Sequence, residues 1–117
     1  MRLNSPRAWI FIIYLGTIVY LSSTPSSEMG YFSFIWRYDK YIHFFEYLIL
    51  GFLLVNALMV NPMRKSDWIV VIVFIIIFPI IDETLQRFTP GRIPDMMDGI
   101  ADISGGLMGI YLRRLFP

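Results

Sequence analysis

The fold is decided by residues 68–86, which read WIVVIVFIIIFPIIDETLQ. Twelve of the thirteen residues from Ile69 to Ile81 are Ile, Val or Phe. Each of them favours insertion into a bilayer by about 0.3–0.6 kcal/mol at a helix centre, which together outweighs one carboxylate near the end of the segment. Because a segment in lipid must satisfy its own backbone hydrogen bonds, this stretch predicts a transmembrane helix over residues 68–86.

Three further apolar stretches are separated from this segment and from each other by short clusters of charged residues, Pro, Ser and Gly. They predict helices over residues 8–21, 40–60 and 96–115. The expected fold class is therefore an all-α membrane protein, a bundle of about four transmembrane helices. With no internal repeat or flexible linker in the sequence, residues 1–117 are expected to form a single transmembrane domain.

The first of these helices is short for a membrane span. Its fourteen residues rise only about 21 Å, whereas the hydrocarbon core of a bilayer is about 30 Å thick. Arg2, Arg7 and the pair Ser22-Ser23 would also suit a cleaved signal peptide. The aromatic residues Trp9, Tyr14 and Tyr20 suit interfacial and packing positions of a retained helix, which tilt or local thinning of the bilayer can accommodate.

The composition agrees with a membrane location and excludes several kinds of site. Hydrophobic residues make up 56% of the 117 residues, more than one small soluble core can bury. The net charge of +1 does not suit a nucleic-acid-binding surface, and the absence of cysteine excludes disulfides, thiolate metal sites and a cysteine nucleophile. We therefore expect a multi-pass protein of the cell membrane that contacts membrane lipids and does not bind nucleic acid.

The basic residues near the ends of the spans predict the orientation. With the N-terminus inside, the cytoplasmic segments hold six of the ten Lys and Arg residues, and the outer segments hold Arg37, Lys40, Arg87 and Arg92. Of the nine acidic residues, only Asp67 then lies on the cytoplasmic side. Both termini are therefore predicted in the cytoplasm, with the other acidic residues near the outer face.

Ionisable residues within a membrane are costly and normally face the interior of the bundle with partners. Three of the predicted helices carry such residues at helical spacing near their outer ends. These stripes consist of Asp39, His43 and Glu46 on the second helix, Asp82 and Gln86 on the third, and Asp95, Asp98 and Asp102 on the fourth. The loop over residues 86–94 contains two prolines and a glycine, so we expect a fixed turn that places Arg87 and Arg92 over a shared polar pocket.

These residues resemble the motifs of the VanZ-like family of small membrane proteins. The matching motifs are Ser22-Ser23-x-Pro25, Asp39-Lys40-x-x-His43-Phe44-x-x-Tyr47, Asp82-Glu83-x-x-Gln86-x-Phe88-x-Pro90-Gly91-Arg92, Pro94-Asp95-x-x-Asp98, and the helix-packing pair Gly105 and Gly109. One departure is Asp102, where the family usually has Asn. The resemblance implies an association with the cell envelope and, for the founding member, low-level resistance to the glycopeptide teicoplanin. It implies no established reaction.

The first functional hypothesis is a pocket that binds a lipid headgroup or a cell-wall-related precursor. The side chains of Arg87, Arg92 and Lys40 suit the anionic groups of such a ligand, and the acidic residues would orient these basic side chains. The candidate ligand-binding residues are Asp39, Lys40, Gln86, Arg87, Arg92, Asp95 and Asp102.

The second hypothesis is a membrane-embedded, metal-assisted hydrolase or transferase. In it His43 and Glu46 would transfer protons or coordinate a metal, and Asp98 and Asp82 would serve as ligands or orienters. The candidate catalytic residues are His43, Glu46, Asp82, Glu83 and Asp98, and the metal candidates are His43, Glu46, Asp82 and Asp98. One histidine and several carboxylates favour Mg or Mn over Zn as a divalent cation.

The third hypothesis is a structural or partner-binding subunit. Its main feature is the aromatic segment over residues 31–36, which would also suit an interfacial segment resting on lipid. The sequence leaves open the ligand, the presence of catalysis and the oligomeric state.

Overall fold

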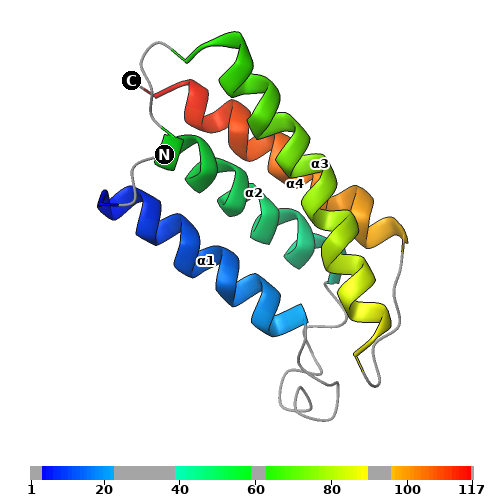
Figure 1. Ribbon diagram of the computed structural model, residues 1–117. Coiled ribbons are helices and arrows are strands. Elements are labelled where there is room, and N and C mark those ends of the chain that lie inside the picture. The colour runs from blue at the N-terminus through cyan, green and yellow to red at the C-terminus, as the bar shows by residue number, and fades with distance from the viewer. Residues whose placement is uncertain (1–3, 23–38, 59–62, 90–95, 117) are drawn as a thin grey trace.

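The structure is a computed structural model, and it describes residues 4–22, 39–58, 63–89 and 96–116. In these ranges the chain forms α1 (Pro6–Ser22), α2 (Asp39–Leu58), α3 (Lys65–Arg87) and α4 (Met96–Arg114), and no strands. Successive helices run in opposite directions, so α2 and α4 are parallel to each other and antiparallel to α1 and α3 (Figure 1). The predicted all-α fold class is confirmed for the described residues.

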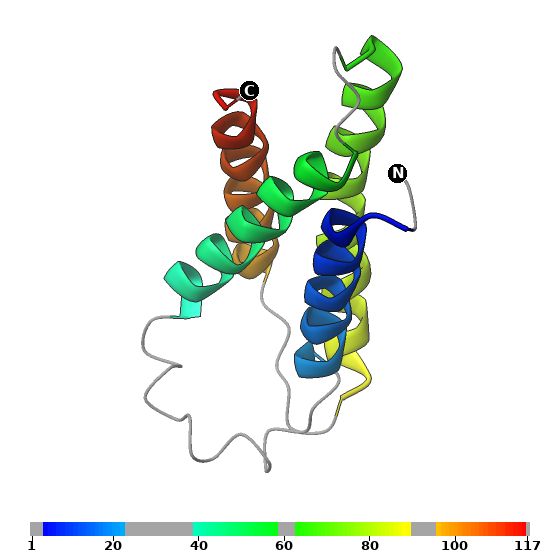
Figure 2. The same cartoon turned by 90° about the vertical axis from the view of Figure 1, so that its left-hand side faces the viewer.

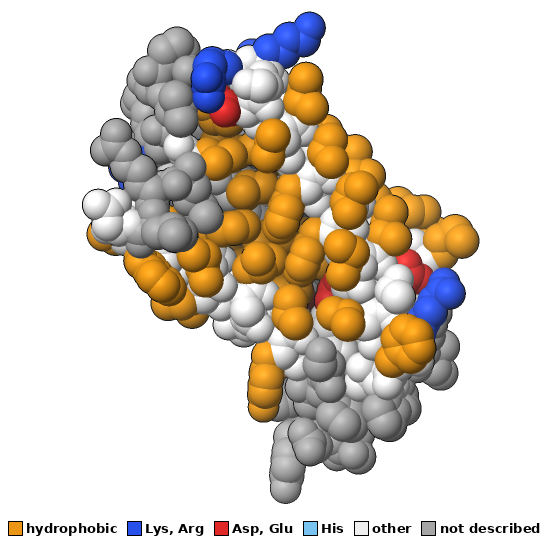
Figure 3. All heavy atoms as spheres, viewed as in Figure 1, with side chains coloured by type: hydrophobic (Ala, Val, Ile, Leu, Met, Phe, Trp, Pro, Cys, Tyr) orange, Lys and Arg blue, Asp and Glu red, His pale blue; other side chains and the backbone are white. Residues whose placement is uncertain are grey.

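Two ends of the bundle differ in charge. The end where α2 and α4 begin is called the acidic end and holds Asp82, Glu83, Asp98 and Asp102. The opposite end is called the basic end and holds Arg7, Arg64, Lys65, Arg113 and Arg114. An apolar surface lies between the two charged regions in Figure 3.

The helices begin and end within a few residues of the predicted positions. α1 begins two residues earlier, at Pro6, because proline suits the first turn and the Ser5 hydroxyl accepts a hydrogen bond from the Arg7 amide at 3.3 Å. α3 begins three residues earlier, because the Asp67 carboxylate accepts a hydrogen bond from the Arg64 amide at 2.9 Å. The predicted end of the second helix, residues 59–60, lies outside the described residues.

Glycines bring α2 and α4 into backbone contact. A Cβ atom built on Gly105 would overlap the carbonyl oxygen of Phe44, and one built on Gly109 would overlap the carbonyl oxygen of Leu48. Small residues at this spacing permit close approach of helices in membranes. The predicted packing role of the glycine pair is confirmed, and this contact fixes how α2 and α4 lie along each other.

The other helices pack against this pair through apolar side chains. α2 lies obliquely across the bundle (Figure 2), and its Leu50 is fully buried together with Val71 and Ile75 of α3. α1 joins α3 through Phe11 and Phe74, whose ring centroids are 6.0 Å apart. The polar residues at the acidic end therefore sit on a packed core.

The outer surface of the bundle is apolar in a way that suits lipid. α3 exposes large aliphatic residues along its length, including Ile69, Val70, Ile77 and Ile80. Residues 40–58 of α2 and the whole of α3 are long and apolar enough to cross a membrane, judged by length and composition. Membrane crossing by α1 and α4, and the orientation of the bundle, stay predictions.

Candidate functional site

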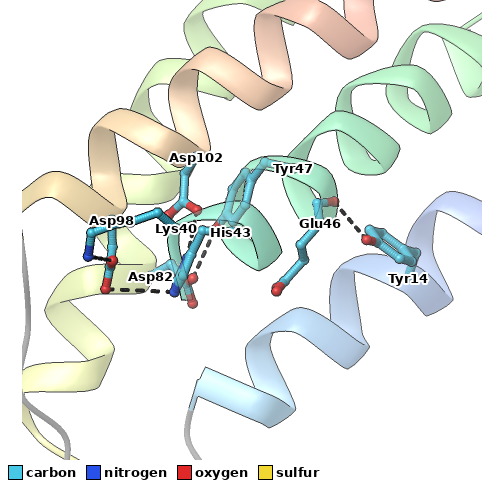
Figure 4. A network of polar contacts seen from close by, with 8 residues as sticks. All are labelled: Tyr14, Lys40, His43, Glu46, Tyr47, Asp82, Asp98 and Asp102. Carbon is cyan, nitrogen blue, oxygen red and sulfur yellow. Dashed lines mark hydrogen bonds and ion pairs between the residues drawn. The ribbon is translucent and has the colours of Figure 1, made fainter. Parts of the chain in front are cut away.

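The polar side chains of α2 and α4 meet at the acidic end (Figure 4). The Lys40 ammonium group donates a hydrogen bond to Oδ1 of Asp98. His43 lies between two carboxylates, with Nδ1 2.7 Å from Oδ1 of Asp102 and Nε2 3.7 Å from Oδ2 of Asp98. We call Lys40, His43, Asp98 and Asp102 the polar cluster.

The parallel packing of α2 and α4 explains why these four residues pair. Lys40 and His43 are three residues apart on α2, while Asp98 and Asp102 are four residues apart on α4, so each pair occupies one face of its helix. Gly105 contacts the α2 backbone about one turn beyond Asp102. Because the backbones are so close there, the short aspartate side chains reach α2 directly.

α3 contributes a buried carboxylate beside the polar cluster. Asp82 is 2% exposed and Tyr47 of α2 is fully buried. The Tyr47 hydroxyl donates a hydrogen bond to Oδ2 of Asp82 at 2.8 Å, which links α2 to α3 (Figure 4). A buried carboxylate requires such a donor, because desolvation of its charge is costly.

The structure gives His43 two carboxylate partners on α4. His43 contacts Asp102 and Asp98 on α4, whereas Glu46 lies toward α1, where its backbone carbonyl accepts a hydrogen bond from the Tyr14 hydroxyl at 2.7 Å (Figure 4). The predicted joint role of His43 and Glu46 in proton transfer or coordination stays a prediction, and Asp102 is a further partner of His43. Asp98 and Asp82 contact different partners, although both lie at the acidic end.

The remaining predicted residues are placed as follows. Glu83 is half-buried and faces the start of α4, where a Cβ atom built on Gly99 would lie 3.5 Å from its Oε2. Gln86 is buried and Arg87 is exposed at the end of α3. Several predicted features lie outside the described residues, namely the side chain of Asp39, Arg92, Asp95 and the aromatic segment 31–36.

Two tyrosines, Tyr14 and Tyr47, make hydrogen bonds that were not predicted from the sequence. Tyr47 is four residues after His43, so it continues the same helical stripe, and this spacing is a signal that could have identified it. Tyr14 offers no such signal, because its partner is a backbone carbonyl on another helix.

The His, Asp and Glu side chains within the described residues are not grouped as a metal site. In this part of the chain no three His, Asp or Glu side chains are grouped so that they could hold a metal ion. The ammonium group of Lys40 places a positive charge against Asp98. A protonated His43 would supply a second positive charge beside Asp102. The cluster can therefore balance its carboxylates, accept hydrogen bonds and move a proton without a metal.

Comparison with known proteins identifies the family. The sequence description of the VanZ/LLP1 family matches residues 8–117, in agreement with the resemblance seen in the motifs. No curated protein and no solved structure matched the chain. Together with the two apolar helices, the family match identifies a membrane protein. Because the match spans nearly the whole sequence, the chain belongs to the VanZ/LLP1 family.

Proposed function

We propose that this membrane protein binds a phosphate-bearing component of the cell envelope, a lipid headgroup or a cell-wall-related precursor, at the polar cluster. The observation that carries the proposal is the convergence of Lys40, His43, Asp98 and Asp102 from two helices. Such a ligand presents an anionic group for the lysine and hydroxyl or amine donors for the carboxylates. Through the family, we also propose a link to resistance against teicoplanin-type glycopeptides.

The cost of the cluster supports a binding role. Asp98 and Asp102 are only 7% and 3% exposed, and a charged side chain within a membrane costs about 2.5–3.5 kcal/mol at a helix centre on insertion scales. Joining α2 to α4 does not require this cost, because the glycine contacts already hold these helices together. Charged groups in excess of what packing needs are typical of sites that bind or react.

Lys40 provides the accessible part of the site. Its side chain is 44% exposed while its ammonium group contacts the buried Asp98. A phosphate group can therefore approach the lysine from the surface without displacing the helices. Arg87, exposed at the same end of the bundle, adds a second cation at that end.

Our proposal places all four helices across the membrane, the acidic end outside and both termini in the cytoplasm. We expect cysteines at the two ends of α3 to be labelled from opposite sides. In intact cells an impermeant maleimide should label Phe88→Cys, whereas Lys65→Cys should react only after the membrane is opened. Both residues are exposed and the chain has no native cysteine to interfere. Labelling with the opposite pattern would reverse the orientation and contradict an external site.

Binding can be tested with defined probes in lipid nanodiscs. We expect the protein to bind a polyprenyl phosphate, and we expect Lys40→Gln to weaken the affinity about ten-fold or more, because a charge-assisted hydrogen bond contributes about 1.5–3 kcal/mol. Native mass spectrometry would detect the retained lipid, and a fluorescence titration would give the dissociation constant.

The matched control for this titration is Arg64→Gln, which removes an exposed cation from the basic end. It should leave the affinity for polyprenyl phosphate unchanged. If Lys40→Gln and Asp98→Asn both fold and both bind this lipid and phosphatidylglycerol as tightly as the unaltered protein, the polar cluster is not a phosphate site.

A second candidate function is a hydrolase or transferase in which His43 acts as general acid and base. The observation that favours it is the contact of Nδ1 with Asp102, since a carboxylate on one ring nitrogen orients a catalytic imidazole. Product analysis of the bound lipid separates the two candidates: cleavage that His43→Gln abolishes supports catalysis, and a bound lipid recovered unchanged supports binding alone.

A further inference from the structure

A groove of about 400 Å³ lies between α3 and α4 at the basic end of the bundle. Its lining combines aliphatic residues, two aromatic side chains and one cation. The lining residues are Trp68 and Ile72 of α3 and Leu107, Ile110, Tyr111 and Arg114 of α4. None of these residues belongs to the polar cluster, which is at the opposite end.

The lining residues are arranged by polarity along the groove. Trp68 lies in the first turn of α3 and Arg114 in the last turn of α4, so both residues lie close to the basic end of the bundle. Leu107 lies about two turns further in. Aromatic residues of this kind favour the headgroup level of a bilayer, and the apolar interior suits an acyl chain.

We propose that this groove binds one anionic phospholipid, with an acyl chain between α3 and α4 and its phosphate against Arg114. Arginine suits this role because its guanidinium group can donate two hydrogen bonds to one phosphate. Arg114 is exposed, whereas the adjacent Arg113 is buried and donates to Oδ1 of Asn56 at 3.2 Å. Arg114 is therefore the guanidinium group that faces a lipid.

The charge of the surroundings favours an anionic headgroup. Arg114 lies at the end of the bundle that also holds Arg7, Lys65 and Arg113. The carboxylate of Asp67 at this end contacts Nε of Arg64 at 3.4 Å. A headgroup with a net negative charge is thus attracted more strongly here than a zwitterionic one. This inference requires only that the basic end lies at a membrane surface, and it holds for either orientation and without the proposed function.

A second groove supplies an internal control. It has a volume of about 530 Å³ and runs along α3, with an entirely apolar lining of Ile69, Val70, Val73, Phe74, Ile77, Phe78 and Ile81. With no charged residue in its lining, this groove should accept acyl chains without regard to the headgroup.

Fluorescence quenching by brominated lipids can compare the two grooves. In a Trp9→Phe/Trp36→Phe background, Trp68 is the single tryptophan and reports on the α3/α4 groove. We expect brominated phosphatidylglycerol to quench Trp68 with an apparent affinity about five-fold higher than brominated phosphatidylcholine. A tryptophan placed in the second groove by Val73→Trp, with Trp68→Phe, should be quenched equally by both lipids.

Arg114→Gln should abolish the preference at Trp68, whereas Arg7→Gln, at the same end but outside the groove, should keep it. High salt should also reduce the preference in the unaltered protein, and this measurement does not depend on how a variant folds. Equal quenching of Trp68 by the two lipids at low salt, or a preference that survives Arg114→Gln in folded protein, would overturn the proposal.

Discussion

Replacing Gly109 with alanine is expected to force α2 and α4 apart and to destabilise the protein by about 3 kcal/mol or more. The added Cβ atom would overlap the carbonyl oxygen of Leu48 and lie 2.8 Å from the amide nitrogen of Phe52. Both are backbone atoms, so no rotamer change can relieve the overlap, and one helix must move. Reversible unfolding in mixed micelles would measure the loss.

The matched control is Gly16→Ala on α1. A Cβ atom at Gly16 would have nothing within 4 Å, and alanine is the better helix former, so this variant should be at least as stable as the unaltered protein. Surface substitutions usually change the free energy of unfolding by less than about 0.5 kcal/mol. If Gly109→Ala also changed it by no more than this, the close approach of α2 and α4 would be wrong.

The same glycines explain which parts of the fold the sequence could predict. Hydropathy located the four helices, because each of them coincides with an apolar stretch bounded by charged residues, Pro, Ser or Gly. The helix ends were predicted less well, since they depend on single hydrogen bonds. The contact between the Asp67 carboxylate and the Arg64 amide, which extends α3 to Lys65, is too local to appear in a hydropathy pattern.

The members of the candidate site could be predicted, but their partners could not. Helical spacing placed His43, Asp82, Asp98 and Asp102 at one end, as the structure has them. Which carboxylate meets His43 depends on how α2 and α4 slide and rotate against each other. The glycine contacts fix that register, and it turns Asp102 toward His43 while Glu46 lies toward α1. A pattern within one helix contains no information on such a register.

The second large effect is expected at the buried pair of Tyr47 and Asp82. Tyr47→Phe removes only the hydroxyl that donates to Oδ2 of Asp82. We expect this substitution to destabilise the protein by about 1–3 kcal/mol. The Asp82 carboxylate then loses a hydrogen-bond donor at a buried position, where water does not readily replace it. Tyr14→Phe is the matched control: it removes a hydrogen bond to the Glu46 carbonyl and should cost about 0.6 kcal/mol, the average for such bonds between membrane helices.

A double-mutant cycle makes this prediction specific to the pair. Asp82→Leu alone leaves the Tyr47 hydroxyl buried without its carboxylate, whereas Tyr47→Phe/Asp82→Leu replaces both partners with apolar groups. The double variant should therefore be less destabilised than the sum of the single variants by about 1–3 kcal/mol. Strict additivity of the unfolding free energies would mean that the two side chains are not in contact.

The double variant also separates a structural role of Asp82 from a role in binding. If Asp82 only joins α3 to α2, a stable Tyr47→Phe/Asp82→Leu protein should bind polyprenyl phosphate as the unaltered protein does. If the carboxylate belongs to the site, binding should change although stability is largely recovered. We expect tighter binding of the anionic lipid, because Asp82 lies beside the polar cluster in Figure 4, and removal of its negative charge lowers the repulsion of a phosphate group in a medium that screens charge poorly.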